Sequence, residues 1–329
     1  MAILRWLTAR QPSTTLVIAL ILGPAVGMAF LSRWRFALAY LAAAILLVGA
    51  VLVIADVSSA RFDAFAVAAY AAITLHVGGA IHCAVAARAR RPQRWYGTWA
   101  AVLLMWAGVP LIAATGVRTF LAEPFTIPAA SMRPALDVGD TVVAAKGAYG
   151  YTPFSGFPMR LLGLTVAQTM PEPGDVVVLR NPRRPEVTFA KRVVAGPGDT
   201  VAMRGGVLHI NGQAVGLTDP EPALPADTNT AELTQQIETL PNGVRYPILN
   251  TTNASVYDDT PDLLVPDRHV FVLGDHRDNS VDSRVPTLGM VPVDHLVGRL
   301  GYLVWNTERN EFILETLGER AQEAVDAAP

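Results

Sequence analysis

The sequence predicts a multi-span α-helical membrane anchor followed by a mainly-β domain, and three observations support this. The 329 residues are 51% hydrophobic and 16% charged, with a mean hydropathy of +0.33, which excludes a disordered polymer and disfavours an ordinary soluble enzyme. Residues 1–117 carry nine arginines and two acids, whereas residues 118–329 carry seventeen bases and twenty-six acids. Long uncharged runs end near residue 117, where short β-branched runs begin. We therefore place two domains, at 1–117 and 118–329.

Four uncharged stretches approach the roughly 20 residues that cross about 30 Å of hydrocarbon. We expect three or four spans, at about 14–31, 36–55, 64–87 and 95–117. Gly23-Pro24 allows a broken or re-entrant first segment. Residues 1–30 are also similar to a cleavable signal peptide, which we disfavour because its loss would put the basic loop that follows on the far side. His76 and His82 share the third stretch with no carboxylate, so we interpret them as packing positions.

Arginines in the short loops predict the orientation, because Lys and Arg are retained on the cytoplasmic side. The loop at 88–94 holds four arginines and is expected inside, as are Arg33 and Arg35. The loop at 56–63 holds two aspartates and one arginine and is expected outside. Everything after Val117 is then extracytoplasmic. The basic half suits a membrane, and we do not expect nucleic-acid binding.

Short β-branched runs punctuated by Pro, Gly and Asp fill the second domain. We predict strands at 141–143, 175–179, 193–194, 207–210 and 269–273, with turns at Pro173-Gly174-Asp175, Pro197-Gly198-Asp199 and Asn211-Gly212. A polar, Pro- and Thr-rich insertion at about 217–268 separates two core strands. A helical period appears only in the tail near 310–326. The single cysteine, Cys83, excludes an intrachain disulfide.

Lysine is rare in this chain, since only Lys146 and Lys191 stand among twenty-six basic residues. A lysine retained where arginine is the rule can lose its proton near neutral pH, which a guanidinium cannot. Lys191 lies in an alternating strand, and apolar neighbours would lower its pKa by desolvating the ammonium. It is a candidate general base, although the segment alone also fits a surface lysine. We interpret Lys146 as structural.

Two further segments contain polar residues in unusual settings. Ser131 lies among small residues between Pro128 and Pro134, in a stiff turn where a hydroxyl and backbone N–H groups stay accessible. Taken alone, this is also a plain Pro-rich loop. The run Gly274–Arg284 follows an apolar strand with Asp, Arg, Asn and Ser, and lacks the glycine and glutamate of a calcium loop. It fits a hydrogen-bonded network around a site or a polar surface turn.

The three segments together resemble the signature of type I signal peptidases, membrane-bound serine proteases with a Ser-Lys dyad (peptidase family S26). Ser131-Met132-Arg133-Pro134 resembles the first box of that family, the run Lys191–Asp199 the second, and Gly274–Arg284 the third, in the family's order. The resemblance covers most of residues 120–305. It implies a signal-peptidase/LexA-like β fold for a mainly-β catalytic domain, with no metal or cofactor.

The resemblance also implies roles for individual residues. Ser131 would be the nucleophile, with its backbone N–H in the oxyanion hole, and neutral Lys191 the general base. Ser280 would hydrogen-bond and orient the lysine. Asp282 and Arg284 would form a supporting ion pair, with two further supporting residues nearby, Asp275 and Arg277.

Substrate-binding positions follow in the same way. Ile127, Val178 and Ala190 match positions that line shallow pockets for small side chains, as Ala-x-Ala sites require. Ala129 replaces the serine that helps bind the oxyanion in many bacterial members, and Phe125 is a candidate for an apolar surface on the lipid. The implied function is removal of signal peptides from exported preproteins at the bacterial cytoplasmic (inner) membrane. The expected partners are signal peptides, the lipid bilayer and the secretion translocon.

Two alternatives remain open at this point. A Ser-His-Asp hydrolase could use His276 or His295; His276 stands where the family usually has Asn. A multi-span protein whose β domain only binds its partner would be no enzyme, and it would tolerate loss of the Ser131 hydroxyl.

Overall fold

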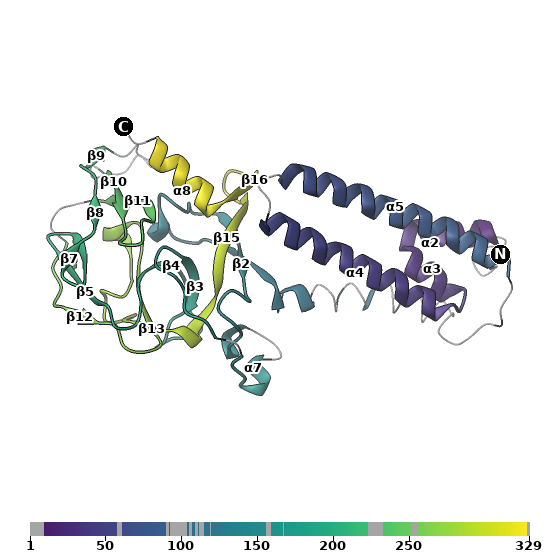
Figure 1. Ribbon diagram of the computed structural model, residues 1–329, viewed down its shortest axis with the longest axis horizontal. Helices are drawn as coiled ribbons and strands as arrows, with labels where there is room; N and C mark the ends of the chain where they lie inside the picture. Colours follow the sequence, from purple (N-terminus) through teal and green to yellow (C-terminus); the bar gives the residue numbers. More distant parts are fainter. Residues whose placement is uncertain are drawn as a thin grey trace. The chain divides into compact units, whose positions relative to one another are not determined.

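The computed structural model divides the chain into two compact units, a helical unit at Met1–Ala114 and a β unit at Thr115–Pro329 (Figure 1). It describes residues 10–57, 61–89, 92, 104, 107–108, 111, 115–118, 120–155, 159–166, 168–222, 233–251 and 255–327. The fourth predicted span, at 95–117, lies mostly outside these residues, and so do Arg90, Arg91 and Arg94 of the predicted cytoplasmic loop.

The described part of the helical unit contains α2 (Pro12–Leu22), α3 (Pro24–Phe30), α4 (Trp34–Val57) and α5 (Arg61–Ala87). The first predicted span is broken into α2 and α3, the alternative that Gly23-Pro24 allowed. Gly23 has a φ of +95°, which favours glycine, and Pro24 has no N–H with which to continue α2. α4 and α5 run side by side (Figure 1).

One segment among the described residues, Tyr70–Ala87 of α5, has the length and apolarity to cross a membrane, and α2 is a shorter apolar helix. The number of spans therefore stays a prediction. His82 Nδ1 lies 2.9 Å from the Tyr40 hydroxyl, and His76 Nε2 lies 2.8 Å from the Leu20 carbonyl. Both histidines thus make hydrogen bonds within the helical unit.

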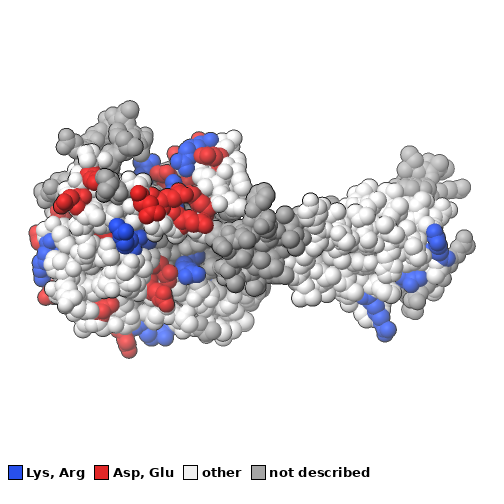
Figure 2. Space-filling model, turned by 45° about the horizontal axis from the view of Figure 1, so that its top comes forward, with Lys and Arg blue, Asp and Glu red and all other residues white. Residues whose placement is uncertain are grey.

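Charge is distributed differently over the two units (Figure 2). The face in view shows acidic and basic side chains interspersed on the β unit, whereas the described part of the helical unit is white apart from a few basic side chains. Arg33 precedes α4, and its guanidinium donates at 3.0 Å to the Ala86 carbonyl in the last turn of α5. The start of α4 and the end of α5 thus lie together.

The β unit is built on an eight-stranded antiparallel sheet with the order β1-β2-β15-β3-β4-β13-β14, in which β16 also pairs with β15. Its strands are β1 (Ala122–Thr126), β2 (Asp140–Ala145), β3 (Val176–Arg180), β4 (Thr188–Ala195), β13 (His269–Leu273), β14 (Val291–Pro292), β15 (Leu296–Asn306) and β16 (Glu311–Thr316). Val176 and Val178 of β3 pack into one core cluster, and Val177 and Leu179 into another. Both faces of this strand are therefore covered, which explains its continuous apolar run.

Two smaller sheets complete the unit. One contains β8 (Gly216–Leu217), β9 (Glu221–Pro222), β10 (Thr234–Thr239) and β11 (Arg245–Asn250); the other contains β5 (Thr200–Arg204), β6 (Val207–Ile210), β7 (Gln213–Ala214) and β12 (Leu263–Leu264). The polar insertion thus contributes strands to both. Short helices are η2 (Ala130–Met132), η3 (Pro153–Ser155), α7 (Met159–Leu162), η4 (Arg277–Asn279) and η5 (Val293–His295).

The tail differs from the helical prediction at 310–326. Its first half is β16, and the helix α8 begins only at Leu317 and ends at Asp326. Thr316 and Glu319 form a capping box that starts the helix there, which blocks its extension toward β16. Leu317, Ala321 and Val325 are buried on one face of α8.

Candidate active site

Ser131 lies on a loop between β1 and β2 whose two ends pair with each other. Ile127 N–H donates to the Asp140 carbonyl at 2.8 Å, and Gly139 N–H donates to the Ile127 carbonyl at 2.9 Å. Between these ends the short helix η2 carries Ser131, which is partly exposed. The loop that carries the Ser131 hydroxyl is therefore held at its base by two backbone hydrogen bonds.

Lys191 reaches Ser131 from β4, a central strand between β3 and β13. Its Nζ lies 2.7 Å from Ser131 Oγ and donates at 2.9 Å to the Ala190 carbonyl. Only 1% of the residue is exposed. The fold thus brings together two residues that stand 60 positions apart in the sequence.

Burial of Lys191 makes its neutral amine easier to reach than that of an exposed lysine. Burial lowers the pKa of Lys191 to about 8, because an ammonium is poorly solvated in the interior, while the Asp282 and Asp275 carboxylates oppose this shift. The ring centroid of Phe189 lies 5.4 Å from Nζ. A lysine with such a pKa can accept a proton near neutral pH.

The segment Gly274–Arg284 places several buried charged residues near Ser131 and Lys191. Arg284 and Asp282 form a bidentate ion pair with N–O distances of 2.9 and 2.8 Å. Asp282 also accepts from the Gly274 N–H at 3.2 Å, and Arg284 donates at 2.5 Å to the Arg277 carbonyl. The Asp282–Arg284 ion pair therefore connects both ends of the Gly274–Arg284 segment.

Asp275 and Arg277 pair with residues that the sequence analysis missed. Arg192 binds Asp275 through two hydrogen bonds of 2.8 and 2.6 Å, and Arg277 binds Glu238 of β10 through two of 2.8 and 2.6 Å. The Tyr246 hydroxyl donates to Glu238, and the Tyr246 ring lies 4.0 Å from the Arg192 guanidinium. Burial opposes the charge of Arg277, but the Glu238 carboxylate outweighs it and raises the pKa of Arg277.

Ser280 differs from the expectation. Lys191 bonds to Ser131 and Ala190 rather than to Ser280, and the buried Ser280 Oγ has no hydrogen-bond partner among the described residues. Ser280 is nevertheless close by: a Cβ placed on Gly274 would lie 2.5 Å from Ser280 Cβ and 2.6 Å from the Ser131 carbonyl oxygen. Only glycine fits between these two segments.

Four of the five predicted substrate-binding residues come together. Ile127 and Val178 belong to one core cluster, and Phe125 and Ala190 are partly buried against it. Val178 and Ala190 are direct partners across β3 and β4. Ala129 is instead exposed, in extended backbone just before η2. Phe125, Ile127, Val178 and Ala190 thus share one apolar cluster, to which Met132, the residue after Ser131, also belongs.

The histidines form no triad in the described part of the chain. The backbone N–H of His276 donates to the Ser131 carbonyl at 3.2 Å, but no side-chain hydrogen bond reaches its ring, and burial lowers its pKa. His295 Nδ1 lies 3.3 Å from the Arg180 carbonyl, and its ring lies against Phe154. Neither ring contacts a carboxylate and Ser131 together, as a triad requires.

Known proteins are similar to this chain over more than half of its length. Residues 99–305 match the family model described as "Signal peptidase, peptidase S26". A signal peptidase I of Rickettsia typhi is 33% identical over 202 residues, which are 58% of this chain and 75% of that protein. One of Pseudomonas fluorescens is 38% identical over 201 residues, 57% of this chain and 66% of that protein.

Among solved structures, a signal peptidase I from Enterococcus faecalis is 25% identical and aligns over 40% of this chain and 97% of its own, with a TM-score of 0.25. The family match alone spans more than half of the sequence and contains the segments of Ser131, Lys191 and Ser280. The chain belongs to the signal peptidases of peptidase family S26.

Proposed function

We propose that this protein is a membrane-bound serine endopeptidase that removes N-terminal signal peptides from exported preproteins, with Ser131 as nucleophile and Lys191 as general base. The 2.7 Å contact between the buried Lys191 amine and the Ser131 hydroxyl supports it best. A hydroxyl is a weak nucleophile until an adjacent base accepts its proton, and a neutral lysine at this distance is such a base. The similar proteins of Rickettsia typhi and Pseudomonas fluorescens are both named signal peptidase I.

The reaction then proceeds in two halves. Lys191 accepts the Ser131 proton as Oγ attacks the scissile carbonyl, and the resulting ammonium is held by the Ala190 carbonyl. The oxyanion accepts from the Ser131 N–H, and Ala129 adds no side-chain donor to it. The ammonium returns its proton to the leaving amine, which breaks the C–N bond. Lys191, neutral again, activates the water that hydrolyses the acyl-enzyme.

Substrate choice is expected to depend on Ile127, Val178 and Ala190, which pack in one apolar cluster. We expect them to line shallow pockets that accept small side chains, as in an Ala-x-Ala cleavage site. The proposed location is the bacterial cytoplasmic membrane, with several spans and with the β unit on the extracytoplasmic side, where preproteins leave the translocon. Phe125 is proposed to rest on the lipid there.

The direct test is cleavage of a preprotein by the detergent-solubilised chain. We expect Ser131→Ala to lower kcat/KM by at least about 1,000-fold, whereas His276→Asn stays within about 3-fold of wild type, since a Ser-Lys dyad needs no imidazole. Absence of preprotein cleavage in wild type as well as in Ser131→Ala would indicate a binding protein, whereas equal cleavage by both would exclude Ser131 as the nucleophile. A loss in His276→Asn as large as that in Ser131→Ala would favour the triad hydrolase.

The pH profile of cleavage should report Lys191. Because the active form is the neutral amine and its pKa is lowered to about 8, we expect kcat/KM to rise about tenfold per pH unit below pH 8 and to level off above it. Initial rates between pH 6 and 10 on a preprotein whose own groups do not titrate there would show this. A flat profile, or a midpoint near 10.5, contradicts a buried general base.

A further inference from the structure

The loop that carries Ser131 is closed at one end by a turn of two carboxylates. Asp137 N–H donates at 2.8 Å to Asp140 Oδ2, and Asp140 pairs through its backbone with Ile127. The position of Ser131 therefore depends on how firmly the turn 137–140 is held.

Asp140 is held by residues from the end of the chain. None of it is exposed, and its carboxylate accepts from Asn306 Nδ2 at 2.7 Å and from Arg320 Nη1 at 2.9 Å. A buried carboxylate needs such partners, because it loses its hydration shell. Asn306 is the last residue of β15, and Arg320 lies in α8, which packs against β15 (Figure 1).

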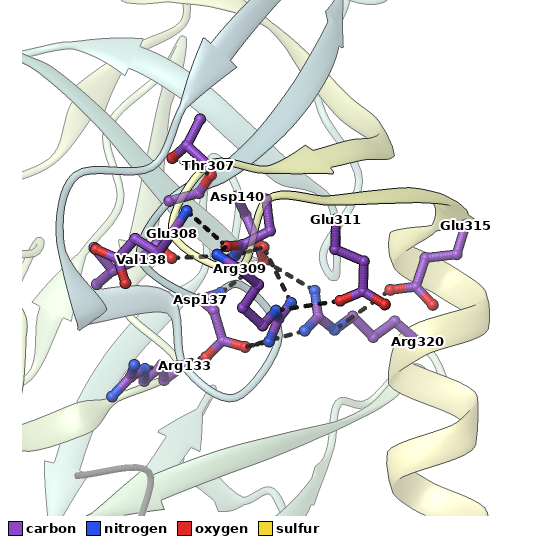
Figure 3. Close-up of polar contacts among 12 residues, drawn as sticks. Arg133, Asp137, Val138, Asp140, Thr307, Glu308, Arg309, Glu311, Glu315 and Arg320 are labelled. Carbon is purple, nitrogen blue, oxygen red and sulfur yellow. Dashed lines mark hydrogen bonds and ion pairs between the residues drawn. The ribbon is translucent and has the colours of Figure 1, made fainter.

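Asp137 joins the same residues to the nucleophile segment (Figure 3). Its carboxylate contacts Arg320 at 3.2 Å and Arg309 at 3.3 Å, and it accepts from Arg133 Nε at 3.1 Å. Arg133 follows Ser131 by two residues. Ion pairs thus lead from Arg320 in α8 through Asp137 to Arg133, next to the nucleophile segment (Figure 3).

The two C-terminal arginines are themselves held on their far sides. Arg309 Nε lies 3.6 Å from Glu311, and Arg320 Nε lies 3.6 Å from Glu315. The side chain of Arg320 is only 19% exposed, so solvent screens its contacts less than those of a surface pair. Each guanidinium therefore lies between carboxylates, and Arg320 is the more buried of the two, since the Arg309 side chain is 46% exposed.

We propose that Asn306, Arg309 and Arg320 form a C-terminal clamp that positions Ser131 against Lys191, with Arg309 and Arg320 as positioning residues of the peptidase. All three lie beyond residue 305, where the match to the family model ends. The proposal rests on the proposed function, since it assigns the clamp to the reaction of Ser131. Attack geometry tolerates little displacement: about 1 Å can lower a rate 100-fold.

The test compares full-length variants in detergent on an Ala-x-Ala preprotein. Arg320→Gln removes one cation from both carboxylates, Arg309→Gln/Arg320→Gln removes both, and Arg320→Lys keeps the charge. The matched control is Arg204→Gln, because Arg204 pairs with Asp262 at 2.6 Å in the sheet of β5 with both side chains about half exposed or more. Thermal unfolding of each variant gives the folded fraction at the assay temperature.

We expect kcat per folded molecule to fall about 10-fold in Arg320→Gln and roughly 100-fold in the double variant, with KM within about twofold. Arg320→Lys should retain at least about half of kcat, and Arg204→Gln should match wild type. The pH midpoint near 8 should persist at a lower plateau, because the clamp contacts the serine loop and not Lys191. Should the double variant not fold, Arg320→Gln alone decides, since Arg133 and Arg309 still hold Asp137.

The clamp is refuted if kcat per folded molecule in Arg320→Gln equals wild type, or falls no further than in Arg204→Gln. A loss that comes entirely from a shifted pH midpoint with an unchanged plateau also contradicts it, since that would place the effect on the lysine. Failure of the proposed function is a separate result, because wild type would then cleave no better than Ser131→Ala.

Discussion

Lys191→Met is expected to abolish preprotein cleavage and, at pH 7, to raise the free energy of unfolding. The activity falls by at least about 1,000-fold because no base remains to accept the Ser131 proton. The stability rises because the wild-type protein must bury an ammonium whose pKa is lowered to about 8 in the folded state, against about 10.4 in the unfolded chain. Methionine fills similar volume without charge. The gain at pH 7 is roughly 1–3 kcal/mol.

The sign of this effect can be checked through its pH dependence. Between pH 8 and 10.4 the unfolded wild-type chain binds more protons at Lys191 than the folded one, so wild-type stability rises with pH in that window. The advantage of Lys191→Met should therefore shrink from pH 8 upward and vanish near pH 10.5. Denaturant unfolding of both proteins at several pH values measures it.

The control for this prediction is the other lysine. Lys146 is also buried, but its Nζ lies 2.7 Å from the Glu123 carboxylate. Lys146→Met leaves that carboxylate with Arg118 alone and should lower the stability while cleavage persists. Retained cleavage in Lys191→Met, or a loss of stability at pH 7 as large as in Lys146→Met, would show that Lys191 is a structural cation.

Glu238→Ala is expected to destabilise the β unit by about 3–5 kcal/mol. Glu238 and Arg277 are 1% and 3% exposed, and the substitution leaves the guanidinium of Arg277 charged, buried and without its carboxylate. The Tyr246 hydroxyl loses its acceptor at the same time. Chemical denaturation of the detergent-solubilised chain gives the difference.

A double substitution separates the effect of the buried charges of Glu238 and Arg277 from the effect of their side-chain packing. Glu238→Leu/Arg277→Met removes both ions and should recover most of the lost stability, because well-packed apolar side chains replace buried ion pairs at little or no net loss. The matched surface control is Asp262→Ala, which breaks the exposed pair with Arg204 and should change stability by less than about 1 kcal/mol. A loss of stability in Glu238→Ala no larger than in this control would show that the Glu238–Arg277 pair contributes little to the free energy of unfolding.

Local patterns predicted four of the eight strands of the main sheet. The β-branched runs at 141–143 and 269–273 lie in β2 and β13, and the turn at Asn211-Gly212 has both residues at positive φ, as a tight hairpin requires. β15 was missed as a strand, because two glycines, Gly298 and Gly301, interrupt its apolar pattern. At Gly298 an added Cβ would lie 2.6 Å from the Ala145 carbonyl, so that glycine serves close packing between strands and not a turn.

The site was predicted unevenly for a similar reason. Ser131 and Lys191 stand in segments whose composition is unusual for this chain, and the structure places them in contact. Glu238 and Tyr246 lie in a polar insertion where nothing marks them, since their partners Arg277 and Arg192 are distant in sequence. Buried pairing of charges depends on which strands meet, which local patterns do not encode.

The separation of Ser131 and Lys191 by 60 residues has a consequence for biogenesis. Under the proposed mechanism, Ser131 has its general base only when β1, β2 and β4 lie in one sheet. We therefore expect a nascent or partly assembled chain to lack hydrolytic activity. Recovery of cleavage during refolding would mark completion of the whole sheet, later than any spectroscopic sign of secondary structure.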